Sequence, residues 1–168
     1  RNNGNFAQSY KTDTSGICYM NYESGIIENF VVKLKDPFIA TNYVSGVAVY
    51  NKGIIRNGYV YGAPIKMTGR EYITEEQYSA NTVMGSIVAV NYADGLVENV
   101  YSLSDIETRQ VLSANDYAFC IIGNNEGTLK NSFSTGDVYY GDNIRDGFGP
   151  SYRNRYTGSA ANTYYYSE

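Results

Sequence analysis

The chain has 168 residues, a net charge of −4, and 19 tyrosines and 17 glycines against 3 prolines, with no histidine and no tryptophan. Without histidine, these residues cannot build a His-Glu-x-x-His zinc site, a Ser-His-Asp triad or a Cys-His pair. The acidic balance and the lack of a basic stripe argue against nucleic-acid binding, and no run of about 18 apolar residues is present to span a membrane.

Tyrosine favours strands and glycine favours the corners between them, so the composition predicts an all-β chain. Residues 1–14 are polar and are expected to form a lead-in to the fold. The chain begins at Arg1 with no charged-then-apolar leader, which favours a segment of a larger parent chain.

One short pattern recurs four times between residues 15 and 136. Each copy reads glycine, two mostly apolar residues, a charged residue and asparagine, and the copies start at Gly25, Gly53, Gly95 and Gly127. These glycines are 28, 42 and 32 residues apart (53 − 25, 95 − 53 and 127 − 95), so a constant unit carries connections of variable length. Such repeats are typical of solenoids, in which each unit buries its apolar face against its neighbours. The sequence therefore predicts one domain, a right-handed parallel β-solenoid (β-helix) of about four coils with these glycines at the coil corners.

The columns of the repeat predict which side chains face the core. The second and sixth residues after each glycine have the same strand parity, so both columns are expected inside. The sixth column consists of Val31, Tyr59, Tyr101 and Phe133. The third column is always charged and is expected in water: Glu28, Arg56, Glu98 and Lys130.

The fourth column is asparagine in every copy: Asn29, Asn57, Asn99 and Asn131. Asparagine tolerates left-handed backbone geometry, and its amides can hydrogen-bond from coil to coil. We therefore expect a structural ladder at a corner, with a sugar-binding row as the weaker alternative.

The connections between coils carry inserts. Two segments, Thr74-Glu75-Glu76-Gln77 and Ser104-Asp105-Ile106-Glu107, have the form of a capping box and predict short helices over residues 74–80 and 104–112. Residues 142–147 resemble a calcium loop only loosely, since they lack its acidic spacing and its distal glutamate, so no metal is expected. Residues 137–168 are predicted to be an irregular terminal cap or a continuation of the solenoid, with residues 162–166 as a closing strand.

The two cysteines test the coil assignment. Cys18 and Cys120 both lie seven residues before a repeat glycine (25 − 18 and 127 − 120), which places them in one column of the first and fourth coils. Three coils rise by about 14 Å, whereas a disulfide joins Cα atoms within about 7 Å. Two buried, unbridged thiols are therefore predicted.

The clearest copies, residues 53–59, 95–101 and 127–136, resemble the GLUG-type repeats of large secreted surface proteins of Gram-positive bacteria. They are especially similar to the repeat region that precedes the catalytic part in the immunoglobulin A protease family of zinc metallopeptidases. The resemblance covers residues 15–168 and implies a secreted or cell-wall-attached bacterial protein. No catalytic residue carries over, because the family's zinc motif requires histidine.

Three functions are compatible with this sequence. The first is a non-catalytic scaffold or recognition module of such a metallopeptidase, which positions a host glycoprotein such as immunoglobulin A and needs no cofactor. The second is an adhesin module that binds host protein or glycan. The third, a polysaccharide-acting enzyme, is disfavoured because the outward charges alternate in sign instead of clustering carboxylates. The expected binding surface is formed by tyrosines of loops and outer faces: Tyr22, Tyr50, Tyr61, Tyr72 and Tyr78, with Tyr19, Tyr92 and Tyr101 as further candidates.

Overall fold

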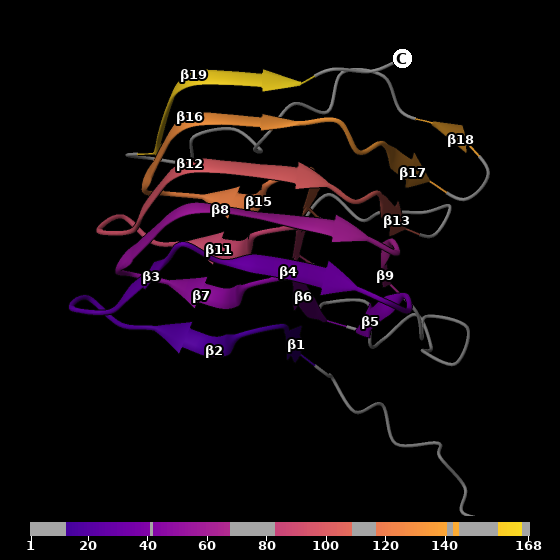
Figure 1. The fold of residues 1–168 in the computed structure, drawn as a ribbon, viewed down its shortest axis with the longest axis horizontal. Helices are drawn as coiled ribbons and strands as arrows, with labels where there is room; N and C mark the ends of the chain where they lie inside the picture. The colour runs from indigo at the N-terminus through magenta and orange to yellow at the C-terminus, as the bar shows by residue number, and fades with distance from the viewer. Residues whose placement is uncertain are drawn as a thin grey trace, which may run out of the picture.

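The computed structural model describes residues 13–40, 42–67, 83–108, 117–140, 143–144 and 158–165. Within these residues the chain is all-β, and its strands stack in parallel sheets as a β-solenoid (Figure 1). Four coils follow one another along the stack, at residues 13–40, 43–67, 83–108 and 117–140, which we call coils 1 to 4. The predicted fold class is confirmed.

Each coil contributes one rung to each of four sheets. Sheet A consists of β1 (Asp13–Ser15), β6 (Tyr43–Ser45), β10 (Val83–Gly85) and β14 (Tyr117–Phe119). Sheet B consists of β2 (Cys18–Asn21), β7 (Ala48–Asn51), β11 (Val88–Asn91) and β15 (Ile122–Asn125). Sheet C consists of β3 (Ile26–Glu28) with β4 (Val31–Leu34), β8 (Ile54–Gly62), β12 (Leu96–Leu103), β16 (Thr128–Ser134) and β19 (Ser159–Tyr165). Sheet D consists of β5 (Phe38–Ala40), β9 (Ile65–Met67), β13 (Ile106–Thr108), β17 (Val138–Tyr140) and β18 (Asn143–Ile144).

All described pairings are parallel except that of β17 with β18. Like residues of successive coils therefore form rows, which in sheet C run vertically in Figure 1 from β3 up to β19. The second column of the repeat is one such row, Ile27–Ile55–Val97–Leu129, and its last three members are fully buried. Valine, isoleucine and leucine in these rows make one continuous core along the stack.

The sixth column does not face this core, which corrects the prediction made from parity. Val31 and Phe133 are 58 % and 41 % exposed, while Val60 and Val100, one position to either side of that column, are fully buried. The cause is the asparagine of the fourth column, which is left-handed in every copy, with φ between 46° and 56°. This turn reverses the alternation of inward and outward side chains, so parity cannot be carried across it.

No helix occurs in the described part of the chain, which corrects the expectation of a helix over residues 104–112. Ile106 pairs with Ile65 and Val138 in sheet D and is fully buried, so stacking between coils overrides the local capping-box pattern. Residues 109–112 and the other expected helix, residues 74–80, lie outside the described residues.

The connections of variable length leave the stack at one place. Coil 1 passes from Ala40 to Tyr43, coil 2 from Met67 to Val83, and coil 3 from Thr108 to Tyr117, always from sheet D to sheet A. The connections contain 2, 15 and 8 residues (43 − 40 − 1, 83 − 67 − 1 and 117 − 108 − 1). Ala40 pairs with Met67 and Tyr43 pairs with Val83, so the 2-residue and 15-residue segments link equivalent positions.

The outer boundaries differ slightly from those expected. The first strand begins at Asp13, within the predicted lead-in of residues 1–14. Val138 extends sheet D, and β19 adds a fifth rung to sheet C, so these strands of the segment 137–168 continue the solenoid.

The two cysteines are not bridged, as predicted, but they do not share a column. Cys18 is in the row of Ala48, Val88 and Ile122, so Cys120 lies two positions earlier in its coil. The reason is that the asparagine-to-glycine corner spans four residues in coil 1 (25 − 21) and only two in coil 4 (127 − 125). Cys120 is buried as expected, whereas Cys18 is only half-buried at the lower end of the stack.

Candidate functional site

Three of the four asparagines of the fourth column, Asn57, Asn99 and Asn131, form an exposed ladder. Asn29 shares their left-handed backbone, but among the described residues no hydrogen bond joins its side chain to Asn57. The amide Nδ2 of Asn99 donates to Oδ1 of Asn57 at 3.2 Å, and that of Asn131 donates to Oδ1 of Asn99 at 3.2 Å. Asn162 of β19, also left-handed, adds a rung by donating to Asn131 at 3.0 Å. These side chains therefore bond to one another from coil to coil, which is the structural role expected of them.

A second asparagine ladder lies inside the corner between sheets B and C and was not predicted as one. Asn21, Asn51, Asn91 and Asn125 are buried, and each of the first three donates its Nδ2 to Oδ1 of the next at 2.8 Å. The signal was present in the sequence, because each of these asparagines precedes a repeat glycine. The corner glycines close on them: a Cβ at Gly95 would lie 2.1 Å from Oδ1 of Asn91.

The outer face of sheet C carries a stack of aromatic rings. Tyr59, Tyr101 and Phe133 occupy successive rungs, with ring centres 4.9 and 5.0 Å apart and planes within 9° of parallel. Parallel rings at this separation must overlap face to face, because coplanar rings would collide. The faces are therefore used within the stack, and the ring edges point outward.

Apolar side chains extend this stack into a broad exposed surface, the aromatic face. Its members on sheet C are Val31, Tyr59, Tyr61, Tyr101, Leu103, Phe133 and Tyr164. Leu103 and Tyr164 are 42 % and 67 % exposed. Neither the core nor an asparagine ladder accounts for these residues, and exposed apolar surface of this kind marks interaction sites.

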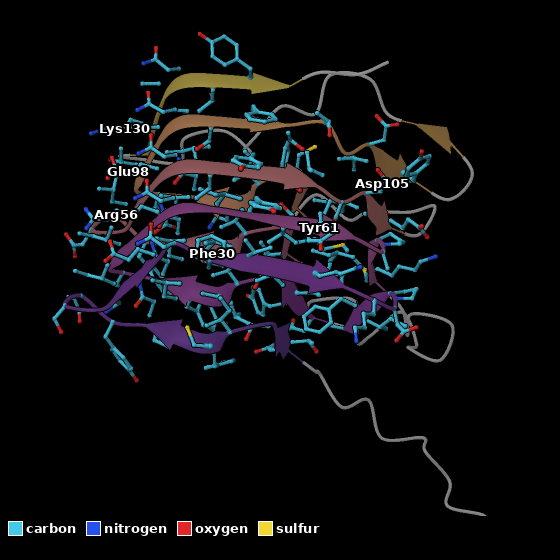
Figure 2. The ribbon with its side chains drawn as sticks, viewed as in Figure 1. Phe30, Arg56, Tyr61, Glu98, Asp105 and Lys130 are labelled. Atoms are coloured by element: carbon cyan, nitrogen blue, oxygen red, sulfur yellow. The ribbon has the colours of Figure 1, made fainter. Side chains whose placement is uncertain are left out.

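Charged side chains line one border of the aromatic face. Figure 2 shows Arg56, Glu98 and Lys130 in a column where the strands of sheet C begin. Arg56 forms an ion pair with Glu28 of coil 1 at 2.7 Å. Signs alternate from coil to coil, which suits cross-strand pairing better than a carboxylate-rich active site.

A second aromatic cluster covers the outer side of sheets A and B. The ring of Tyr50 is at its centre, 5.3 Å from Tyr19, 5.5 Å from Tyr43 and 5.9 Å from Tyr92. Its floor is formed by apolar residues that are at most 7 % exposed: Val49, Val83, Ala89, Val90 and Phe119. Because these rings contact one another directly, the cluster packs as a small outer core.

The hydroxyl side of this cluster is closed by a carboxylate. Asp13 accepts hydrogen bonds from the Tyr19 hydroxyl at 3.1 Å, the Asn42 side-chain amide at 2.7 Å and the Tyr43 backbone amide at 3.2 Å. Burial, followed by the charge interaction with Tyr43, raises the pKa of Tyr50. Burial and then Asp13 raise the pKa of Tyr43, so both phenols remain protonated donors.

The predicted binding tyrosines do not form one site. Tyr22 is 65 % exposed at the corner after β2, and Tyr50 lies in the cluster just described. Tyr61 lies on the aromatic face, with the Lys33 ammonium 5.7 Å from its ring centre. Tyr72 and Tyr78 are outside the described residues.

Two carboxylates meet where sheet C turns into sheet D. Oδ1 of Asp105 accepts the backbone amide of Asp137 at 2.9 Å, and the pKa of Asp105 is raised, chiefly by burial and then by the nearby Asp137 and Glu107. The Asp105 carboxylate thus bonds the backbone of the next coil. No group of three His, Cys, Asp or Glu side chains suited to a metal ion occurs in the part of the chain that the structure describes.

Comparisons add no relative. No protein family model matches the chain, and no curated protein or solved structure matches it either. Among the described residues, no helix is long and apolar enough to cross a membrane.

Proposed function

We propose that this chain is a non-catalytic β-solenoid module of a secreted or wall-attached bacterial metallopeptidase, and that its aromatic face holds a host glycoprotein for the catalytic part. The parent and its location come from the resemblance of the repeats to the immunoglobulin A protease family. The binding surface comes from the side chains on sheet C.

One observation carries the proposal: large apolar side chains remain exposed on this face in the interior coils. Phe133 in coil 4 pairs with Tyr101 below and Tyr164 above, so its exposure is not an end effect, and Leu103 in coil 3 lies beside Tyr61 of coil 2. A polar side chain at such an outward-facing position would leave the packing of the core unchanged. Exposed aromatic and aliphatic residues on a rigid surface favour protein recognition.

The geometry favours the protein part of a glycoprotein over its sugars. A sugar ring packs its C–H groups against the face of an aromatic ring, and here the faces of Tyr59, Tyr101 and Phe133 are turned toward one another. Outward ring edges offer a flat apolar ridge with two hydroxyls, which suits another protein surface.

The adhesin function is the alternative. An adhesin would use the same binding surface and would differ from the metallopeptidase only in its parent chain. The full-length gene therefore distinguishes the two functions, because a His-Glu-x-x-His motif elsewhere in its sequence would support the metallopeptidase. A polysaccharide-acting enzyme is supported less, since the outward column pairs opposite charges.

Surface plasmon resonance with purified immunoglobulin A tests the proposal. The double variant Leu103→Lys/Phe133→Lys should weaken binding at least tenfold, because charged groups would be placed in the contact. Ile39→Lys is the matched control: Ile39 is also exposed, at 47 %, but lies on sheet D, and binding should be unchanged.

Enzymatic removal of the glycans should leave the interaction intact. Loss of binding on deglycosylation, or equal binding by the double variant, would contradict the assignment of the aromatic face to protein recognition. Binding to isolated glycans in an array would favour the adhesin.

A further inference from the structure

The lower end of the stack leaves core rows uncovered. Ile17 is 47 % exposed, whereas the three residues above it in the same row, Val47, Ile87 and Ile121, are fully buried. Ile27 and Cys18 are likewise only half-buried below fully buried neighbours. Coil 1 thus presents an apolar underside that a further coil of the same repeat would cover.

The upper end presents a matching strand. Among the strands that the structure describes, β19 pairs only with β16, and residues 159–162 and Tyr164 are exposed. Its segment Gly158-Ser159-Ala160-Ala161-Asn162 aligns with Gly127-Thr128-Leu129-Lys130-Asn131, so it is a fifth copy of the repeat. An open parallel edge of this kind accepts another strand.

The two ends are complementary in their hydrogen bonding. In the exposed ladder each amide donates toward the coil below it, so Oδ1 of Asn162 is the acceptor that points to the next rung. At the other end, Asn29 has the same left-handed backbone and the matching position in the repeat, so its side-chain amide would supply the donor for Oδ1 of Asn162. Among the described residues, no hydrogen bond reaches Oδ1 of Asn162.

The side-chain rows also match. A coil 1 placed on β19 would set Ile27 over Ala160, Glu28 over Ala161 and Val31 over Tyr164, continuing the rows of the stack. No like charge opposes Glu28 there, and the small Ala160 leaves room for the isoleucine.

From these observations we infer that the two ends of the solenoid bind each other, so that a second copy of the chain stacks head to tail through β19 and coil 1. This interface is heterologous and leaves a new open end after every addition, so it produces a series of oligomers instead of a closed dimer. It does not depend on the proposed function.

Cysteine cross-linking tests the inference in the full chain. The variant Ile26→Cys/Ser159→Cys, made with Cys18→Ala, places thiols in one outward row at opposite ends of the molecule. Cys120 can stay, because burial raises its pKa to about 12 and keeps the thiol protonated. A short bis-maleimide should then give a ladder of dimers, trimers and larger species that fades on dilution.

The matched control is Ile26→Cys/Leu103→Cys in the same background. It has the same number of added thiols, but Leu103 lies in the middle of the stack and should give no ladder. A second variant, Val31→Lys, should weaken cross-linking of the Ile26→Cys/Ser159→Cys protein, because Val31 would lie over Tyr164 of the next copy. Its circular dichroism and melting temperature should stay unchanged because Val31 is already 58 % exposed.

Three results would overturn the inference. The first is cross-linking of equal extent in the Ile26→Cys/Leu103→Cys control. The second is a series of products that stops at the dimer. The third is the absence of cross-links from the Ile26→Cys/Ser159→Cys protein at concentrations where circular dichroism shows that it is folded.

Discussion

At the scale of single residues, asparagine fixes two different corners for two different reasons. Asn99 is exposed and left-handed, with φ of 52°, and links two neighbours through its side chain. Asn91 is buried and satisfies Oδ1 of Asn125 and the carbonyl of Gly95. The position of Asn99 requires a residue that tolerates the left-handed backbone conformation, and the position of Asn91 requires a side-chain amide that both donates and accepts hydrogen bonds.

Substitution of Asn99 separates these needs. Asn99→Ala should lower the free energy of unfolding by about 1 to 3 kcal/mol, since alanine is strained in the left-handed region and makes no ladder bonds. Asn99→Gly keeps the backbone free to adopt φ of 52° and loses only the bonds, so its cost should be smaller. Urea denaturation measures both, and a glycine variant less stable than the alanine variant would contradict this account.

Asp105 is expected to make stability depend on pH. Its pKa is raised above the ordinary 3.8, chiefly by burial, so the folded chain holds this proton more tightly than the unfolded chain. The benefit of the protonated form is complete below pH 3.8 and is lost as pH rises through the raised folded-state pKa. The charged carboxylate therefore destabilises the fold at neutral pH.

Asp105→Asn should remove this cost, because the amide oxygen can still accept the backbone N–H of Asp137. The variant should melt above the wild type at pH 7 and together with it at pH 3.5. Thermal melts at both values measure the difference, and Asp36→Asn, at an exposed position, is the control. An equal gain for Asp105→Asn at both pH values would point to a cause other than the charge.

At the scale of elements, the sequence predicted the position of the coils better than it predicted which side chains of each coil face the core. The glycine spacing located sheet C, because glycine and asparagine recur at the two ends of one short strand segment. Parity failed beyond Asn29 and its equivalents, since a left-handed residue changes the face on which later side chains point. The helix expected from Ser104 failed because Ile106 is stacked between Ile65 and Val138, a contact between coils that no local pattern records.

The fifth copy at Gly158 was missed for a related reason. It carries two alanines where other copies have an apolar and a charged residue, so the column pattern is weak, and only its glycine and asparagine keep the signature. The aromatic face was predicted only in part, at Tyr61 and Tyr101, because the outward direction of the sixth column follows from the same reversal at the corner asparagine.

The connections between sheets D and A can be exchanged if the coil is a constant unit. Replacing residues 68–82 with the Thr-Asn link of residues 41–42 joins equivalent positions, because Ala40 pairs with Met67 and Tyr43 with Val83. Circular dichroism should remain that of a β protein. The free energy of unfolding should stay the same or rise by about 1 to 2 kcal/mol, because a shorter loop costs less entropy to close.

The control for this exchange deletes β10 instead, which removes the fully buried Met84 and should abolish folding. If shortening residues 68–82 abolished the circular dichroism spectrum of a β protein, this segment would be required for folding and would not be an exchangeable connection.

At the scale of the whole molecule, the stack behaves as a one-dimensional array in which each coil is stabilised by the coils beside it. Ile27 and Ile55 provide a matched pair, since they are the same residue in one row of sheet C. Ile55 lies between Ile27 and Val97 and is fully buried, whereas Ile27 pairs with a residue on one side only within residues 13–165 as the structure describes them.

Ile55→Ala should therefore cost about 2 to 5 kcal/mol of unfolding free energy, as for a buried isoleucine, and Ile27→Ala less than about half of that. Denaturant unfolding at low protein concentration gives both values. Because a second copy would cover Ile27, the cost of Ile27→Ala should rise with protein concentration while that of Ile55→Ala stays constant. Equal costs at every concentration would mean that coil 1 is already covered in the single chain, and that its underside is not an open end of the array.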